Sequence, residues 1–103
     1  MECEDITKII LPAVRINMAE QMRDKYHMKQ QEIASRLGVA QVAVSKYLNG
    51  RYSRPVGELK ERINARGLVD DIAAKAAGTQ NTSAINGMIN ELCSKIVSTD
   101  LVN

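Results

Sequence analysis

The sequence contains no phenylalanine and no tryptophan, and its aromatic side chains are limited to three tyrosines. Any hydrophobic core must therefore be built mainly from aliphatic side chains. No run of residues approaches the roughly 18 apolar residues that a membrane-spanning helix needs. The first residues, MECEDITK, are acidic where a secretory signal peptide would be basic, so we expect a cytoplasmic protein without a membrane segment.

Residues that carry out catalysis or hold metals are also scarce. The chain lacks a P-loop, a Rossmann glycine pattern, a nucleophile elbow and an HExxH motif. Cys3 and Cys93 are isolated, because the segment CSKI lacks the second cysteine of a CxxC pair. The single histidine, His27, is expected at the end of a helix, where it would interact with the helix dipole. We therefore predict no enzymatic activity, no cofactor and no metal site.

Positive charge is concentrated in the middle of the chain. The formal net charge is only +2, but residues 15–66 carry eleven basic and five acidic side chains. Such a local excess is typical of a surface that binds a polyanion. Charge alone is equally compatible with an ordinary solvated surface.

Apolar residues recur at helical rather than strand spacing along most of the chain. One face of a first helix is expected to carry Leu11, Val14, Met18, Met22 and Tyr26. Further helices are predicted at about 29–37, 41–48, 55–65 and 68–78, and from about 83 onward. Residues 6–10 could be a helical lead-in or an extended arm. The expected fold is all-α, a compact helical bundle within the size range of a single domain.

The stretch QQEIASRLGVAQVAVSKYLNGR, residues 30–51, contains two predicted helices that are each too short to be stable alone in water. They must therefore pack on each other and on the first helix. Ala34 permits a close approach, and Gly38 suits the left-handed conformation that often ends a helix. Val39 and Val44 would close the corner. This is the pattern of two helices joined at a steep angle by a short turn.

The outer side of the second short helix has the chemistry of a DNA-reading surface. With Val44 placed inward at about 100° per residue, the residues that point outward are Val42, Ser45, Lys46 and Asn49, with Gln41 at the N-terminal tip. Short polar side chains and one lysine fit the major groove, which is about 12 Å wide, and a helix N-terminus favours phosphate. The alternatives are a corner used only for packing, and recognition of protein or RNA.

The same stretch resembles the helix-turn-helix of Cro/phage-repressor-type regulators. The matching features are Gln30, the pair Ile33–Ala34, the turn Leu37–Gly38–Val39, Val44, Ser45 and the segment YLNG. With LPAVR upstream, the resemblance narrows to a group of predicted archaeal transcriptional regulators, some of them fused to a thiamine-phosphate-synthase-like domain. Ala40 departs from the family, in which Ser or Thr usually caps the recognition helix, and this loss should cost about 1 kcal/mol.

The resemblance implies which residues contact DNA. Bases would be contacted by Gln41, Val42, Ser45 and Lys46, and Gln30 would support a phosphate contact. Since most protein–DNA hydrogen bonds go to the backbone, further phosphate contacts are predicted for Asn49, Arg51, Tyr52, Ser53 and Arg54. A solvated loop is the alternative for this segment. Some of the resembling archaeal regulators carry a CxxC near the position of Cys93, which leaves a lost or shared metal site as an alternative to a buried or reduced thiol.

The last predicted helix carries an apolar stripe, at residues 85, 88/89, 92 and 96, with no obvious place in a small core. Packing within the chain and a dimer interface are both open interpretations. We predict a homodimer, because one recognition helix reads few base pairs and two copies would lie about 34 Å apart on a near-palindromic site. The chain would then comprise a DNA-binding domain at 1–78 and a C-terminal helix at 79–103 as a candidate dimerisation element.

The expected function is that of a sequence-specific, DNA-binding transcriptional regulator whose partner is double-stranded operator DNA. One alternative is a protein-interaction adaptor that uses the same corner without binding DNA. Another is the DNA-binding half of a ligand-sensing pair whose sensor is a separate chain. The sequence shows no pocket-forming composition, so it assigns no small-molecule effector.

Overall fold

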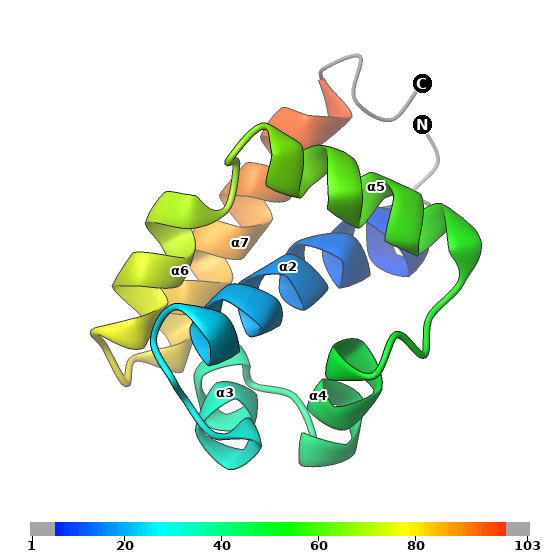
Figure 1. Ribbon diagram of the computed structural model, residues 1–103. Coiled ribbons are helices and arrows are strands. Elements are labelled where there is room, and N and C mark those ends of the chain that lie inside the picture. Colours follow the sequence, from blue (N-terminus) through cyan, green and yellow to red (C-terminus); the bar gives the residue numbers. More distant parts are fainter. Residues whose placement is uncertain (1–5, 99–103) are drawn as a thin grey trace.

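The computed structural model describes residues 6–98, which fold into a bundle of helices (Figure 1). A π-helical turn, η1 (Ile6–Ile10), leads directly into α2 (Leu11–Asp24). The other helices are α3 (Gln30–Leu37), α4 (Gln41–Leu48), α5 (Arg54–Ala65), α6 (Asp70–Ala77) and α7 (Thr82–Val97). No strand occurs within the described residues, and the radius of gyration is 12.4 Å, so the prediction of a compact all-α fold is confirmed.

The helix α2 is the centre of the bundle. It crosses the middle of the molecule in Figure 1 and packs against α3, α4, α5, α6 and α7. Its side chains Val14, Ile16, Met18 and Met22 are fully buried. The surrounding helices contribute further aliphatic side chains to the same cluster, among them Ile33, Leu37, Val44, Ile63, Ile85, Ile89 and Ile96. The core is therefore aliphatic, as the composition requires.

The end of α2 differs from the prediction. Tyr26 does not belong to the buried stripe, because it lies beyond the helix and 39% of its surface is exposed. The chain leaves the helix at His27, whose φ of 56° is left-handed. This conformation lets the His27 amide donate to the Arg23 carbonyl at 3.1 Å and the Met28 amide to the Met22 carbonyl at 3.0 Å. His27 thus ends the helix through its backbone, two residues beyond the cap, and the expected interaction of its side chain with the dipole stays a prediction.

The apolar stripe of α7 is buried inside the chain. Ile85, Ile89, Leu92 and Ile96 are each exposed by 9% or less, and α7 packs against α2, α3 and α6. Packing within the chain is therefore the correct interpretation of these four side chains, and they are not free to meet a partner. The division of the chain at residue 78 remains a prediction, although both segments contribute to one core.

A polar network joins α2, α5 and α6 inside the bundle. Lys60 is only 7% exposed, and its ammonium donates to Glu61 and, at 3.3 Å, to Glu20. Burial disfavours the charged form of Lys60, but the hydrogen bond to Glu61 and the charge of Glu20 outweigh it and raise the pKa of Lys60. Beside it, Gln21 donates at 2.8 Å both to Asn17 and to Asp70, the first residue of α6. The network fixes the relative positions of three helices.

We expect Lys60→Ala to lower the free energy of unfolding by about 1–2 kcal/mol at neutral pH, since it removes a buried stem and leaves Glu20 unpaired. Lys60→Met keeps an apolar stem of similar length, so it should lower the free energy of unfolding by less than Lys60→Ala. Because the pKa of Lys60 is raised on folding, the ionic contribution should be complete below about pH 10.4 and decline as pH rises through the folded-state pKa.

Urea unfolding of the wild type and both variants at neutral pH and at about pH 11 measures this contribution. The exposed Lys75→Met serves as the control and should change little at either pH. The interpretation is wrong if the difference in the free energy of unfolding between the wild type and Lys60→Met is the same at both pH values.

Candidate nucleic-acid interface

The helices α3 and α4 form a corner at one end of the molecule, as Figure 1 shows. Gly38 ends α3 with φ 69° and ψ 35°, and α4 begins three residues later. The left-handed conformation predicted for Gly38 is confirmed. Leu37 and Val44 are fully buried beneath the corner, and Ala34 is 7% exposed. The corner is therefore anchored on α2 by three apolar side chains close to the turn.

The outer side of α4 faces solvent. Val42 is 64% exposed, and Gln41 and Lys46 are also exposed. Tyr47 and Leu48 are half-buried and pack against the core. Three of the four residues predicted to meet bases thus project from a surface helix, and their contact with DNA remains a prediction.

Ser45 and Asn49 are tied to each other. The Asn49 side-chain amide donates to the Ser45 carbonyl at 2.7 Å and to the Ser45 hydroxyl at 3.4 Å. Ser45 is half-buried, whereas Asn49 is exposed. A base contact from Ser45 could use its hydroxyl hydrogen or the remaining lone pair of its oxygen. A phosphate contact from Asn49 would have to replace one of these bonds. The exposed face predicted for α4 is therefore narrower at its C-terminal end.

The N-termini of α3 and α4 differ in how their first backbone amides are capped. The methyl side chain of Ala40 cannot accept a hydrogen bond, so it caps none of the first amides of α4, although the Ala40 carbonyl accepts from the Ala43 amide at 3.0 Å. At the other helix, the Lys29 amide donates to the Glu32 carboxylate at 3.2 Å, and Gln30 is the first helical residue. The exposed Lys29 was not singled out from the sequence. The only local feature that could have indicated Lys29 is its position as a basic residue directly before α3.

The loop from α4 to α5 carries the remaining predicted phosphate contacts. Arg51 and Ser53 are exposed, and the Arg54 side chain is 90% exposed, paired at 3.1 Å with Glu58. Such an exposed pair is worth about 0.3–0.5 kcal/mol, so Arg54 could exchange Glu58 for a phosphate at little cost. Tyr52 is half-buried and packs against the core. Its ring occupies the space that a Cβ at Gly57 would approach at 3.1 Å, so it also holds the loop against α5.

Two long-range contacts, which we call the C-terminal clamp, hold the corner against α6 and α7. The Thr82 hydroxyl donates to the Ser35 carbonyl at 3.0 Å. The Arg36 guanidinium donates to the Ala76 and Ala77 carbonyls at 2.7 and 2.9 Å, at the end of α6. Arginine at a helix C-terminus satisfies carbonyls that the helix leaves free. The sequence gives no signal for either contact, because the partners lie at least 40 residues apart.

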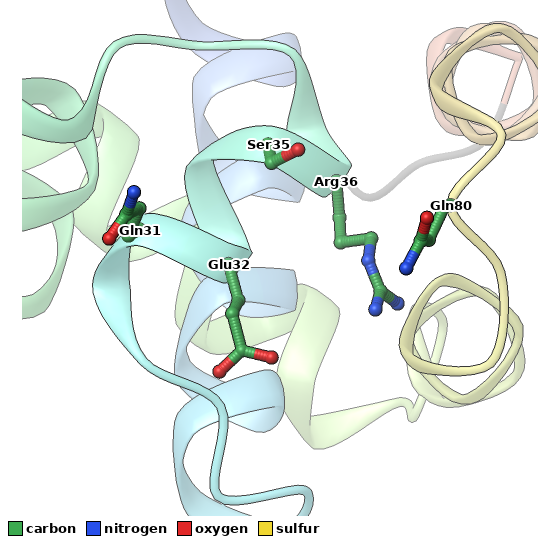
Figure 2. A pocket seen from close by; sticks show the side chains of 5 residues that line it. All are labelled: Gln31, Glu32, Ser35, Arg36 and Gln80. Atoms are coloured by element: carbon green, nitrogen blue, oxygen red, sulfur yellow. The ribbon is translucent and has the colours of Figure 1, made fainter.

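A polar hollow of about 360 Å³ lies beside the C-terminal clamp, lined by Gln31, Glu32, Ser35, Arg36 and Gln80. Figure 2 shows Arg36 of α3 and Gln80 of the α6–α7 connection pointing toward one another, whereas Gln31 points away. The Arg36 guanidinium already binds two carbonyls. Since ligand pockets are usually apolar with a few polar groups, we regard this hollow as a seam between helices.

Cys93 is a buried thiol in α7. It is 3% exposed, and burial raises its pKa, against a smaller opposing effect from the charge of Arg15. Cys3 lies outside the described residues. Between residues 6 and 98, no group of three or more His, Cys, Asp or Glu side chains is placed to hold a metal ion. No helix in the same range has the length and apolar character that crossing a bilayer would require.

Comparison with known protein families finds a match at the corner. A family model described as helix-turn-helix matches residues 20–58, from the second half of α2 to the first turns of α5. This match supports a helix-turn-helix of the Cro/repressor type within residues 20–58. The match supports the fold of DNA-binding regulators, and the matched segment contains all ten residues predicted to touch DNA. No curated protein and no solved structure matches the chain. The broad resemblance is confirmed, and the narrower archaeal one stays a prediction.

Proposed function

We propose that the protein is a sequence-specific transcriptional regulator that places α4 of its helix-turn-helix domain in the major groove of operator DNA. The observation that carries the proposal is the exposure of Gln41, Val42 and Lys46 on the outer side of α4. Ser45 would add a contact through its hydroxyl. These side chains combine an amide, an apolar group and an ammonium, which are the groups that distinguish base edges in the major groove.

Phosphate contacts would fix the position of α4 in the groove. Gln30 and Lys29 lie at the start of α3, Arg51 and Ser53 lie in the loop after α4, and Arg54 begins α5, so contacts would come from segments before and after the recognition helix. Tyr52 and Asn49 would contribute from the same loop. Such contacts position the protein without reading sequence. Occupation of the operator would then block or recruit polymerase in the cytoplasm, without a catalytic step.

The proposal includes a homodimer. An α4 of eight residues reaches only a few base pairs, and two copies on one face of DNA need a spacing of about 34 Å. The longest extent of the described chain is 33 Å, so two protomers placed end to end along this axis would have centres at a comparable spacing. The interface would have to use a surface other than the stripe of α7, since that stripe is buried.

DNA binding should depend steeply on salt. If about six phosphates are neutralised per site, log K should fall against log salt with a slope of roughly −5, because bound cations are released from DNA. Fluorescence anisotropy with a duplex obtained by selection from random sequences, measured at several salt concentrations, gives this slope. Removal of one phosphate contact by Arg51→Ala should lower the magnitude of this negative slope by about one. The remote substitution Arg66→Ala should leave the slope unchanged.

The adaptor hypothesis makes the opposite prediction. It draws support from the exposed Val42, because an apolar side chain on a surface helix can also meet a protein partner. An adaptor should show no salt-dependent retention on heparin and no mobility shift with genomic fragments. It should also tolerate Lys46→Ala and Arg51→Glu. If the slope is close to zero and no sequence is enriched from the random pool, the DNA-binding proposal is wrong.

A further inference from the structure

Val42 occupies an unusual place for an apolar side chain. It is the second residue of α4 and 64% exposed, and among the described residues Tyr26 is the other large hydrophobic side chain that is exposed. Single exposed apolar residues are common and need no partner by themselves. Val42, however, stands between the exposed Gln41 and Lys46 on the surface that would enter the groove. Docking would therefore remove it from water.

The chemistry of the major groove limits what can face an isopropyl group. Base edges offer hydrogen-bond acceptors, amino donors and the 5-methyl group of thymine. A donor or acceptor pressed against Val42 would lose water without gaining a partner, which is unfavourable. A methyl group would lose only unfavourable hydration. Contact with Val42 should therefore weaken binding to base edges that present a donor or acceptor, and should favour the base edge that presents a methyl group.

We infer that Val42 selects a 5-methylpyrimidine in the operator, thymine or 5-methylcytosine, by apolar contact with the methyl group. This inference rests on the proposed function and adds the class of base read at one position. Polar edges are left to Gln41 and Lys46, whose side chains carry the hydrogen-bonding groups of the α4 surface. The basic side chains nearby favour DNA over an apolar protein surface as the partner that covers Val42.

The test removes single methyl groups from DNA. Each thymine of a selected duplex is replaced in turn by uracil, which differs only at the 5-methyl group, and the dissociation constant is measured for the wild type and for Val42→Ala. One thymine should be sensitive in the wild type, with a loss of about fourfold, the effect of one buried methyl group. The same replacement should change binding of Val42→Ala by less than about 1.5-fold.

A second pair of duplexes separates the methyl group from the hydrogen-bonding pattern of the base. At the sensitive position, cytosine and 5-methylcytosine are compared, and the methylated base should bind the wild type more tightly by a similar factor. Thermal unfolding controls for the fold, and Val42→Ala should unfold no earlier than the wild type, because the site is exposed and alanine favours helix.

The outcomes are distinct. If no thymine is sensitive to loss of its methyl group, or if Val42→Ala keeps the full sensitivity, the inference is overturned while DNA binding itself stands. If the random pool yields no enriched sequence, the proposed function fails and the inference falls with it. A methyl effect in both pyrimidine pairs that disappears in Val42→Ala establishes the inference.

Discussion

Lys46→Glu is expected to weaken binding to the selected duplex by about 100-fold or more. A well-placed contact to a base edge is worth about 1–3 kcal/mol of discrimination, and a carboxylate in the groove adds repulsion from phosphates. Lys46 is exposed on α4, so the folded state should lose less than about 0.5 kcal/mol. Anisotropy titrations give the affinity, and thermal unfolding gives the stability.

The matched control is Arg66→Glu, which changes the net charge equally. Arg66 is the exposed C-cap residue of α5. Figure 1 shows the C-terminal end of α5 at the opposite end of the molecule from α4. We expect the control to reduce affinity by less than about threefold, through long-range electrostatics alone. Similar losses for the two variants would mean that overall charge, and not the position of Lys46 in the groove, determines binding.

Gly38→Ala should destabilise the protein by about 2–3 kcal/mol, the largest effect expected from adding a single methyl group. An L-residue in the left-handed conformation costs about 1–2 kcal/mol, and the new Cβ would lie 2.9 Å from the Thr82 methyl carbon. Thr82 cannot easily move, because its hydroxyl is bonded to the Ser35 carbonyl. The substitution therefore strains the turn and pushes α7 away from it.

A second variant separates these two effects. Thr82→Ser removes the methyl group but keeps the hydroxyl that donates to Ser35. In the double variant Gly38→Ala/Thr82→Ser, the contact part of the loss should disappear and about 1–2 kcal/mol of backbone strain should remain. Urea unfolding of the wild type, both single variants and the double variant completes the cycle. Purely additive losses would show that the close approach of α7 to Gly38 does not matter.

The helix-turn-helix corner was predictable because its signals are local. The predicted helix at 41–48 has the same bounds as α4, and Gly38 ends α3 as expected. Apolar spacing around Val44 identified the buried side of α4 and therefore its outer side. Helical periodicity and a glycine in a left-handed position act within a few residues, so a single sequence contains them.

The features that were missed depend on contacts between distant segments. The buried place of the α7 stripe, the Thr82–Ser35 bond and the cap that Arg36 provides for α6 join parts of the chain that no local pattern connects. Tyr26 was assigned to α2 because it continues the apolar spacing. The helix instead ends before it, because His27 takes a conformation more typical of glycine.

The segment that matches the family model is smaller than the part of the chain that shares one hydrophobic core. The match covers residues 20–58, but the hydrophobic cluster runs from Ile10 to Ile96, and η1 touches both α5 and α7. An excised fragment with these limits would lack most of α2, which packs against α3 and α4, and all of α7, which packs against α3, so buried side chains such as Ile33 and Leu37 would become exposed. The shortest piece that can be transplanted into a chimeric regulator therefore begins at η1 and ends with α7.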